Sequence, residues 1–274
     1  MTDVRRRPLV IATGTALGLG ALVTSFPFFW MITSSLKPAS EAISVPPRVL
    51  PSRPSFDAYV RLFTELDFAR YLVNTVVVVA FCAVGLFLMA MAGYGFAKFR
   101  FRGREAIFLA VLTTLMIPVQ VSMIPTYLIL NELHLTNTLL GIAAPMLVSA
   151  FGIFLFRQFM TTIPTELLEA ARLDGAGEFR IFTTIVLPLS KPIVAVQGVL
   201  VFIGAWNSFL WPLVIATEQD KYTLAVGLSL LNQQITINPT LQMAGASVMV
   251  VPIIIVFVIF QRHIVQGFAL SGLK

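Results

Sequence analysis

The sequence predicts an all-α membrane protein of six transmembrane helices, forming a single domain over residues 1–274. Hydrophobic residues make up 57% of the chain and charged residues only 12%, whereas soluble domains carry roughly 45–50% apolar and about 25% charged residues. The charges cluster between uncharged stretches long enough to cross a hydrocarbon layer of about 30 Å, which takes ~20 helical residues. Transmembrane barrels instead show alternating segments of ~10 residues, so helices are favoured over strands.

Six spans follow from the uncharged stretches and from the turn signals between them. The last stretch, Tyr222–Gln261, is too long for one helix, and its polar residues 232–234 and turn signal Asn238-Pro239 predict an aqueous loop. The predicted spans lie near 8–32, 71–96, 107–130, 139–159, 192–216 and 243–261. The first span could be a cleaved signal, but it exceeds the usual core of about 7–15 apolar residues and no small-x-small cleavage site follows, so we favour a retained span.

The outer loop between the first two spans, about Thr33–Arg70, has two parts. It begins with five prolines, which predict an extended strap. The apolar residues that follow recur at helical spacing and predict a short interfacial helix. These apolar residues are Phe56, Tyr59, Val60, Phe63 and Leu66.

The distribution of basic residues predicts the orientation in the membrane. Under the six-span model, thirteen Lys and Arg residues fall on one side and six on the other. The side richer in basic residues is expected to face the cytoplasm, which places both termini there. The basic residues lie beside the apolar stretches, so the net charge of +6 needs no nucleic acid as a partner.

The predicted spans almost entirely lack ionisable side chains that could relay protons or take part in catalysis. Apart from Arg157 near the end of the fourth span, the spans contain no Asp, Glu, Lys, Arg or His, which disfavours a proton-coupled carrier. No catalytic nucleophile with a companion base is apparent, and His134 and His263 are too separated to suggest a metal site. A G-x-x-x-x-G-K-[ST] phosphate loop is also absent, so any nucleotide would be bound by another chain.

The triplet Gly93-Tyr94-Gly95 matches the core of a potassium-channel filter. Such a filter needs backbone carbonyls from a re-entrant loop that lines a pore. This triplet is instead predicted at the cytoplasmic end of the second span, where the chain runs directly into Lys98. We therefore disfavour a filter.

The most informative segment is the cytoplasmic loop 162–191 between the fourth and fifth spans. Pro164 can open a helix, acidic residues follow near its positive end, and Asp174-Gly175 is a natural stop. A second short helix is predicted from Gly177 to Val186, ended by Pro188. The loop is thus expected to be two short helices joined at a glycine turn.

Periodicity divides the first of these helices into a packing side, Leu167, Leu168 and Ala171, and a charged edge, Glu166, Glu169 and Arg172. The small side chains of Ala170 and Ala171 would let another surface come close. An interfacial helix resting on lipid headgroups fits the same pattern, and periodicity alone slightly favours it.

The residue types and their spacing in this loop resemble a known motif. Glu169-Ala170-Ala171, with Gly175 four residues later and then Ile185-x-Leu187-Pro188, resembles the EAA loop of permease subunits of bacterial binding-protein-dependent ABC importers, without a departure in spacing. Further similar segments extend the resemblance over essentially the whole chain and point to the carbohydrate-uptake branch, which includes the maltose and glycerol-phosphate importers. These segments are Tyr94–Arg102, Trp206–Pro212 and Gln261–Gly267.

The resemblance implies a permease subunit that moves a sugar or sugar derivative into the cytoplasm and is itself not an enzyme. It implies a multi-pass protein of the bacterial cytoplasmic (inner) membrane, in contact with membrane lipid. Its implied partners are a second permease forming a heterodimer, a cytoplasmic ABC ATPase dimer that binds ATP and Mg, and an extracytoplasmic sugar-binding protein. A stand-alone secondary carrier or channel is the alternative, and an intramembrane enzyme is a third class that the missing nucleophile disfavours.

The resemblance also assigns site residues. The helix Pro164–Asp174 would be the coupling helix that docks into the ATPase, with Glu169 at the contact, the two alanines permitting close approach and Gly175 turning the chain. The loop residues assigned in this way are Glu169, Ala170, Ala171, Asp174, Gly175 and Pro188. In the fifth span, Trp206 and Asn207 are candidates for the substrate pathway, since an indole and an amide suit a sugar. Helix packing explains this pair equally well.

Overall fold

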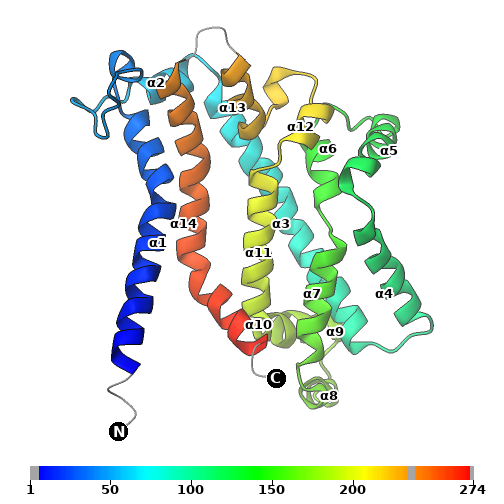
Figure 1. Ribbon diagram of the computed structural model, residues 1–274. Helices are drawn as coiled ribbons and strands as arrows, with labels where there is room; N and C mark the ends of the chain where they lie inside the picture. The colour runs from blue at the N-terminus through cyan, green and yellow to red at the C-terminus, as the bar shows by residue number, and fades with distance from the viewer. Residues whose placement is uncertain (1–5, 234–237, 272–274) are drawn as a thin grey trace. The chain divides into compact units, whose positions relative to one another are not determined.

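The computed structural model describes residues 6–233 and 238–271, and their side chains over 12–231 and 238–261. This part of the chain is helical and contains no strand, which confirms the all-α class. Three helices are long and apolar enough to cross a membrane, and three bent helix pairs raise the possible number of spans to six. The principal helices are α1 (Arg6–Ser35), α2 (Asp57–Thr64), α3 (Phe68–Lys98), α4 (Arg104–Thr113), α5 (Val119–Glu132), α6 (Leu139–Ala143), α7 (Ala150–Thr161), α8 (Thr165–Leu173), α9 (Glu178–Ile181), α10 (Leu187–Leu189), α11 (Lys191–Trp206), α12 (Leu210–Ile215), α13 (Leu224–Gln233) and α14 (Pro239–Ser271) (Figure 1).

The chain forms two compact units. The first comprises Met1–Phe68 and Leu228–Val250, and the second comprises Ala69–Gly227 and Val251–Lys274. The second unit contains the whole cytoplasmic loop predicted at 162–191 and both groups of candidate site residues.

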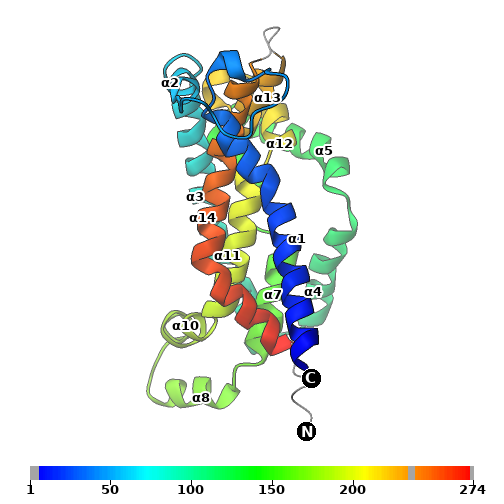
Figure 2. The same cartoon turned by 60° about the vertical axis from the view of Figure 1, so that its left-hand side comes forward.

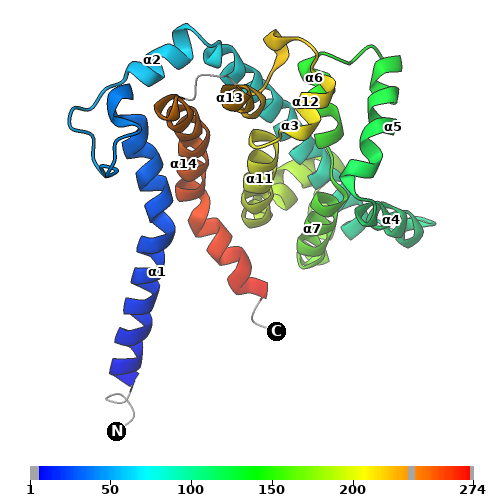
Figure 3. The same cartoon turned by 45° about the horizontal axis from the view of Figure 1, so that its top comes forward.

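In the first unit, α1 is one long helix, and the loop after it turns back before the short helix α2 (Figure 3). The helix α2 confirms the short helix expected in the outer loop. The end of α1 is tied to α2 by a 2.7 Å hydrogen bond between the hydroxyls of Ser35 and Tyr59. The buried Lys37 ammonium donates to Ser34 Oγ at 3.1 Å and lies 4.2 Å from the centre of the Trp30 ring.

In the second unit, α3 packs closely against the α6–α7 segment through glycines. A Cβ atom at Gly85 would lie 1.7 Å from the carbonyl oxygen of Leu147, and one at Gly93 would lie 2.4 Å from Cβ of Phe156. Only residues without a Cβ allow two backbones to approach so closely. The triplet Gly93-Tyr94-Gly95 therefore lies within a packed helix, as expected from its place in the sequence.

The third predicted span is not one straight helix. Its two halves, α4 with a short 3₁₀ turn and then α5, are bent by 106° at Ile117-Pro118. A residue before proline is pushed out of the α region, and Ile117 has φ −88° and ψ 116°. The sequence interpretation overlooked this signal because the hydropathy remains high across the break.

The fourth and fifth predicted spans are interrupted as well. Residues 139–146 and α7 are bent by 48°, and Ser149 begins α7 by accepting a 3.0 Å hydrogen bond from the Gly152 N–H. The fifth stretch ends as a continuous helix at Trp206, and α12 starts only at Leu210. Figures 1 and 2 show α12 and α6 at the opposite end of this unit from α8.

The last stretch differs from the prediction at its beginning. Residues 224–233, expected to belong to a loop, form the helix α13, and the final helix α14 starts at Pro239 rather than near residue 243. Residues 234–237 of the predicted aqueous loop lie outside the described part of the chain. The prediction placed too much weight on the polar residues 232–234, two of which continue a helix.

Candidate functional site

The helix α8 in the loop 162–191 has the predicted limits. Pro164 occupies the N-cap position, Glu166 lies in the first turn and Asp174 is the C-cap residue. Gly175 follows with φ +81°, a backbone conformation that glycine adopts without strain. Its N–H donates to Arg172 O and the N–H of Ala176 to Ala171 O, both at 3.0 Å. These two bonds form the Schellman motif that ends many helices at a glycine.

The helix α8 has one side packed and one side open. Leu168 is completely buried and Ala171 is half-buried, as predicted. Leu167 was expected to pack beside them, but 47% of it is exposed, and Leu173 is 89% exposed. Together with the exposed Glu169 and Ala170, they form an open surface that combines carboxylates with apolar groups.

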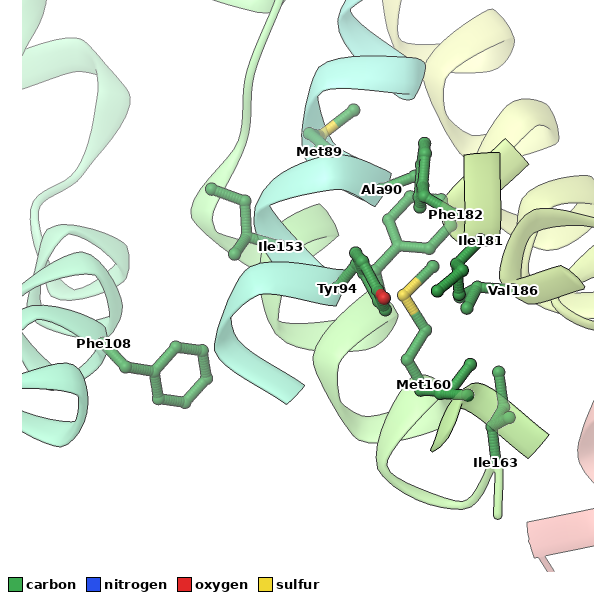
Figure 4. Packing of buried hydrophobic residues seen from close by; sticks show 12 residues of the cluster. Met89, Ala90, Tyr94, Phe108, Ile153, Met160, Ile163, Ile181, Phe182 and Val186 are labelled. Carbon is green, nitrogen blue, oxygen red and sulfur yellow. The ribbon is translucent and has the colours of Figure 1, made fainter. Parts of the chain in front are cut away.

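The buried side of α8 belongs to an apolar cluster that joins five segments of the chain. Leu168 packs in this cluster with residues of α3, α4, α7 and the segment 181–186. Figure 4 shows the rings of Tyr94 and Phe182 next to one another, with Met160 close by. Apolar burial therefore fixes how α8 lies against the end of α3.

An ion pair closes the turn after α8. Arg172 Nε lies 2.6 Å from Glu178 Oε1, at the first position of α9, and Arg172 Nη2 lies 3.2 Å from Glu178 Oε2. The Glu178 carboxylate raises the pKa of the Arg172 guanidinium above its ordinary value. Both side chains are partly exposed, so the pair adds little to stability, but it joins α8 to α9 across the turn. The sequence interpretation missed Glu178, although an acidic residue six positions after Arg172 and across a glycine turn was a usable signal.

The second helix of the loop does not end at Pro188. It continues through a π-helical segment, Phe182–Val186, into α10, and only then bends by 83° into α11. Proline has no N–H to donate and its ring clashes with the preceding turn of an α-helix. The wider π-helical turn in front of Pro188 accommodates the proline without ending the helix.

Pro188 also lines a cavity of about 730 Å³ in the second unit. The walls come from α3, from Phe156 of α7, from the segment 183–202 and from α14, and are almost wholly apolar. Thr183 and Lys191 supply the only polar side chains among its lining residues. The cavity therefore begins beside the loop 162–191 and follows α11.

The two pathway candidates lie at the far end of α11. Trp206 is 4% exposed and stacks on Phe202, with ring centres 5.3 Å apart and ring planes at 25°. Asn207 is exposed at the C-cap, where its N–H donates to Ile203 O at 3.1 Å. Phe202 lines the cavity, whereas Trp206 and Asn207 do not. The 16 residues of α11, about 24 Å of helix, separate this pair from the loop that contains α8.

One further polar residue of α11 was missed. Gln197 is 3% exposed, and its Oε1 has no hydrogen-bond partner among the described residues. Its Nε2 would lie 2.8 Å from a Cβ atom at Gly152, at the start of α7. A single amide in an otherwise apolar stretch was the sequence signal for this residue.

Similarity to known proteins accounts for nearly the whole chain. Residues 85–269 match the family described as the binding-protein-dependent transport system inner membrane component. The chain is 36% identical over 262 residues to the arabinooligosaccharides transport system permease protein AraQ of Bacillus subtilis (strain 168), covering 93% of this chain and 92% of the relative. It is 35% identical over 268 residues to the lactose transport system permease protein LacG of Rhizobium radiobacter, covering 97% of each. A crystal structure of a bacterial ABC transporter involved in the import of the acidic polysaccharide alginate matches with a TM-score of 0.85 and 26% identity, covering 96% of this chain and 99% of that chain.

Proposed function

This chain belongs to the family of inner-membrane components of binding-protein-dependent transport systems, and from this membership we propose how its residues import a solute. The protein is a permease subunit of an ABC importer for a sugar or sugar derivative and forms half of the translocation pathway. It is a transporter and not an enzyme. The observation that carries this conclusion is the match of more than nine-tenths of its length to permeases named for arabinooligosaccharides and lactose.

The helix α8 is the coupling helix. Its open surface docks into a cleft of a cytoplasmic ABC ATPase, with Glu169 at the contact and Ala170 and Ala171 allowing close approach. The exposure of Glu169, Ala170 and Leu173 beside the buried Leu168 supports this role, because a docking helix needs one side held by its own protein and one side free. The φ of Gly175 supports its assigned function as the turn after the helix.

Asp174 and Pro188 complete the loop. Asp174 is the C-cap residue of α8, and Pro188 lies where α10 meets the cavity. ATP and Mg are bound by the ATPase dimer, whose closure pulls α8. Because α8 is packed on the end of α3, this pull reaches the spans that surround the cavity.

The complete importer is a multi-pass assembly of the bacterial inner membrane. Both termini and α8 face the cytoplasm, in agreement with the excess of basic residues on that side. A second permease completes the pathway as a heterodimer, and an extracytoplasmic sugar-binding protein delivers the sugar to the outer loops. The break at Asn207 presents an exposed amide and helix end to the pathway, where sugar hydroxyls can be bound.

Purification of the tagged chain together with the products of neighbouring genes tests this function. We expect an ATPase and a second permease to copurify, and we expect ATP hydrolysis by the complex to rise when loaded binding protein is added. Identification of the sugar bound to that binding protein then defines the substrate. Sugar uptake into vesicles by this chain alone, without ATP, would instead establish a secondary carrier.

A further inference from the structure

The end of α8 that carries Arg172 is linked to α3 through a buried phenol. The hydroxyl of Tyr94 donates to Glu178 Oε2 at 3.0 Å, and the same carboxylate holds Arg172. Tyr94 and Glu178 are 84 positions apart in the sequence. A single carboxylate therefore joins three helices, α3, α8 and α9.

The other end of α8 is linked to the same helix. The ammonium of Lys98, the last residue of α3, donates to the carbonyl oxygen of Ile163, just before the N-cap of α8. Glu166 in the first turn of α8 also attracts this ammonium. Since Tyr94 and Lys98 are four residues apart, they project from one face of α3. One helical turn of α3 thus holds α8 at both ends.

Packing of the Tyr94 side chain depends on its ring and not on its hydroxyl. The residue is only 5% exposed, and its ring lies 5.3 Å from the Phe99 ring and 5.5 Å from the Phe182 ring. A phenylalanine would keep both ring contacts, because the two side chains differ only by the oxygen. The hydroxyl is therefore separable from the packing of the cluster.

We propose that Tyr94 is a positioning residue for transport, and that its hydroxyl makes α3 follow α8 when the ATPase moves. This inference rests on the proposed docking of α8. Without the bond, α8 remains folded through Leu168 and remains paired with Glu178, but its motion reaches α3 only through Lys98 at the other end of α8 and through apolar contacts, which can slide. Since α3 forms one wall of the cavity, the accessibility of the cavity would then change less when ATP binds to the ATPase.

The motion of α3 can be measured without knowing the sugar. Val79 of α3 lines the cavity, so a cysteine introduced there reports its accessibility to N-ethylmaleimide. The native Cys82 is replaced by alanine in all variants. In the complete complex, we expect trapping with ATP and vanadate to change the labelling rate of the cysteine at position 79.

The variant Tyr94→Phe should reduce this ATP-dependent change about tenfold or more, the scale of one hydrogen bond to a charged group. Three quantities should stay at parental levels: the labelling rate without ATP, the amount of complex and the amount of trapped nucleotide. If the hydroxyl had a purely structural role, at least one of these quantities would fall. Tyr59→Phe is a matched control, because it also removes a hydrogen-bonded hydroxyl, in the other unit. It should leave the labelling change intact.

Glu178→Gln weakens the same bond from the acceptor side, because it removes the charge of the acceptor, and it also removes the ion pair with Arg172. It leaves the ring cluster untouched and gives a second variant if Tyr94→Phe lowers the amount of complex. If both residues act through one bond, the double variant should show no larger defect than Glu178→Gln alone. A full ATP-dependent change in Tyr94→Phe, or no change in the parental complex, would overturn the proposal. Failure of the docking model is distinguishable, because it would appear as normal ATPase binding in Glu169→Lys.

Discussion

The helix α8 and the junction of α11 with α12 both place neighbouring residues in opposite surroundings. In α8, Leu168 is buried and Glu169 is exposed, and at the junction Trp206 is buried and Asn207 is exposed. The two regions are held in different ways. Side-chain bonds to charged groups and a Schellman turn orient α8, whereas at the junction Trp206 stacks on Phe202 and Trp211 of α12 donates to the carbonyl oxygen of Ile142 at 3.2 Å.

This difference predicts which substitutions should affect each region. The position of α8 depends on a few directional bonds and on one backbone conformation in addition to the burial of Leu168, so small changes can misplace it while the spans remain intact. The end of α11 depends on distributed apolar packing, which tolerates the loss of one exposed polar group. Changes in α8 should therefore affect coupling, and changes at Asn207 should affect only how the solute is handled.

The largest expected effect tests whether the two regions face opposite sides of the membrane. A cysteine at the exposed Thr217, just after α12, should react in intact cells with an impermeant maleimide, and one at Gly177 should not. A cysteine at position 177 should cause no steric clash, since a Cβ at Gly177 meets no atom within 4 Å. Labelling at Gly177 from outside would reverse the orientation and remove α8 from the reach of ATP.

Gly175→Val should strongly impair coupling. A Cβ at this position meets no atom within 4 Å, so the cost comes from the positive φ alone, about 1–2 kcal/mol. That cost corresponds to about a 5–30-fold decrease in the ratio of correctly placed to incorrectly placed α8. We expect a matching fall in sugar uptake at normal membrane abundance, measured in cells that contain the complete importer.

Two controls separate this effect from general strain. Gly175→Asn should retain most uptake, because asparagine tolerates positive φ. Gly103→Val introduces the same strain at φ +84°, also without a packing clash, but before α4. If Gly103→Val and Gly175→Val reduced uptake equally, the turn after α8 would have no special role.

Glu169→Lys should weaken ATPase binding about tenfold, or ~1.4 kcal/mol, because it reverses a charge at the proposed docking surface. The residue is exposed, so the fold should be unaffected. The measurement is the amount of ATPase retained on purification. Glu132→Lys, an equally exposed charge reversal at the end of α5, should have no effect. Normal retention and uptake in Glu169→Lys would favour a helix that rests on lipid headgroups.

Asn207→Ala should have the smallest effect. Loss of one hydrogen bond to a sugar hydroxyl costs about 0.5–1.5 kcal/mol, which raises the sugar concentration for half-maximal transport about 2–10-fold. Assembly with the ATPase should remain normal, and Asn131→Ala, another exposed amide at a helix end, serves as the control. Unchanged transport kinetics would show that Asn207 has only a local structural role.

Much of the membrane architecture was predictable from the sequence. Long uncharged stretches located α1, α3 and α14, because removal of apolar side chains from water depends mainly on their number. The breaks were less apparent from hydropathy. Ile117-Pro118 was a readable signal, and so was Pro212, since a proline breaks the helix in the turn before it and the interruption lies at residues 207–209.

The sequence by itself determined the helical class, the limits of α8 and the turn at Gly175, since hydropathy, caps and positive φ are properties of neighbouring residues. Only the tertiary structure decided that Leu167 faces outward and that Tyr94 meets Glu178. Periodicity states which residues share a helix face, but not which protein surface that face meets. A hydrogen bond between residues 84 positions apart forms only if packing of the whole unit brings their two helices together. Local sequence patterns contain no information on the distance between those helices.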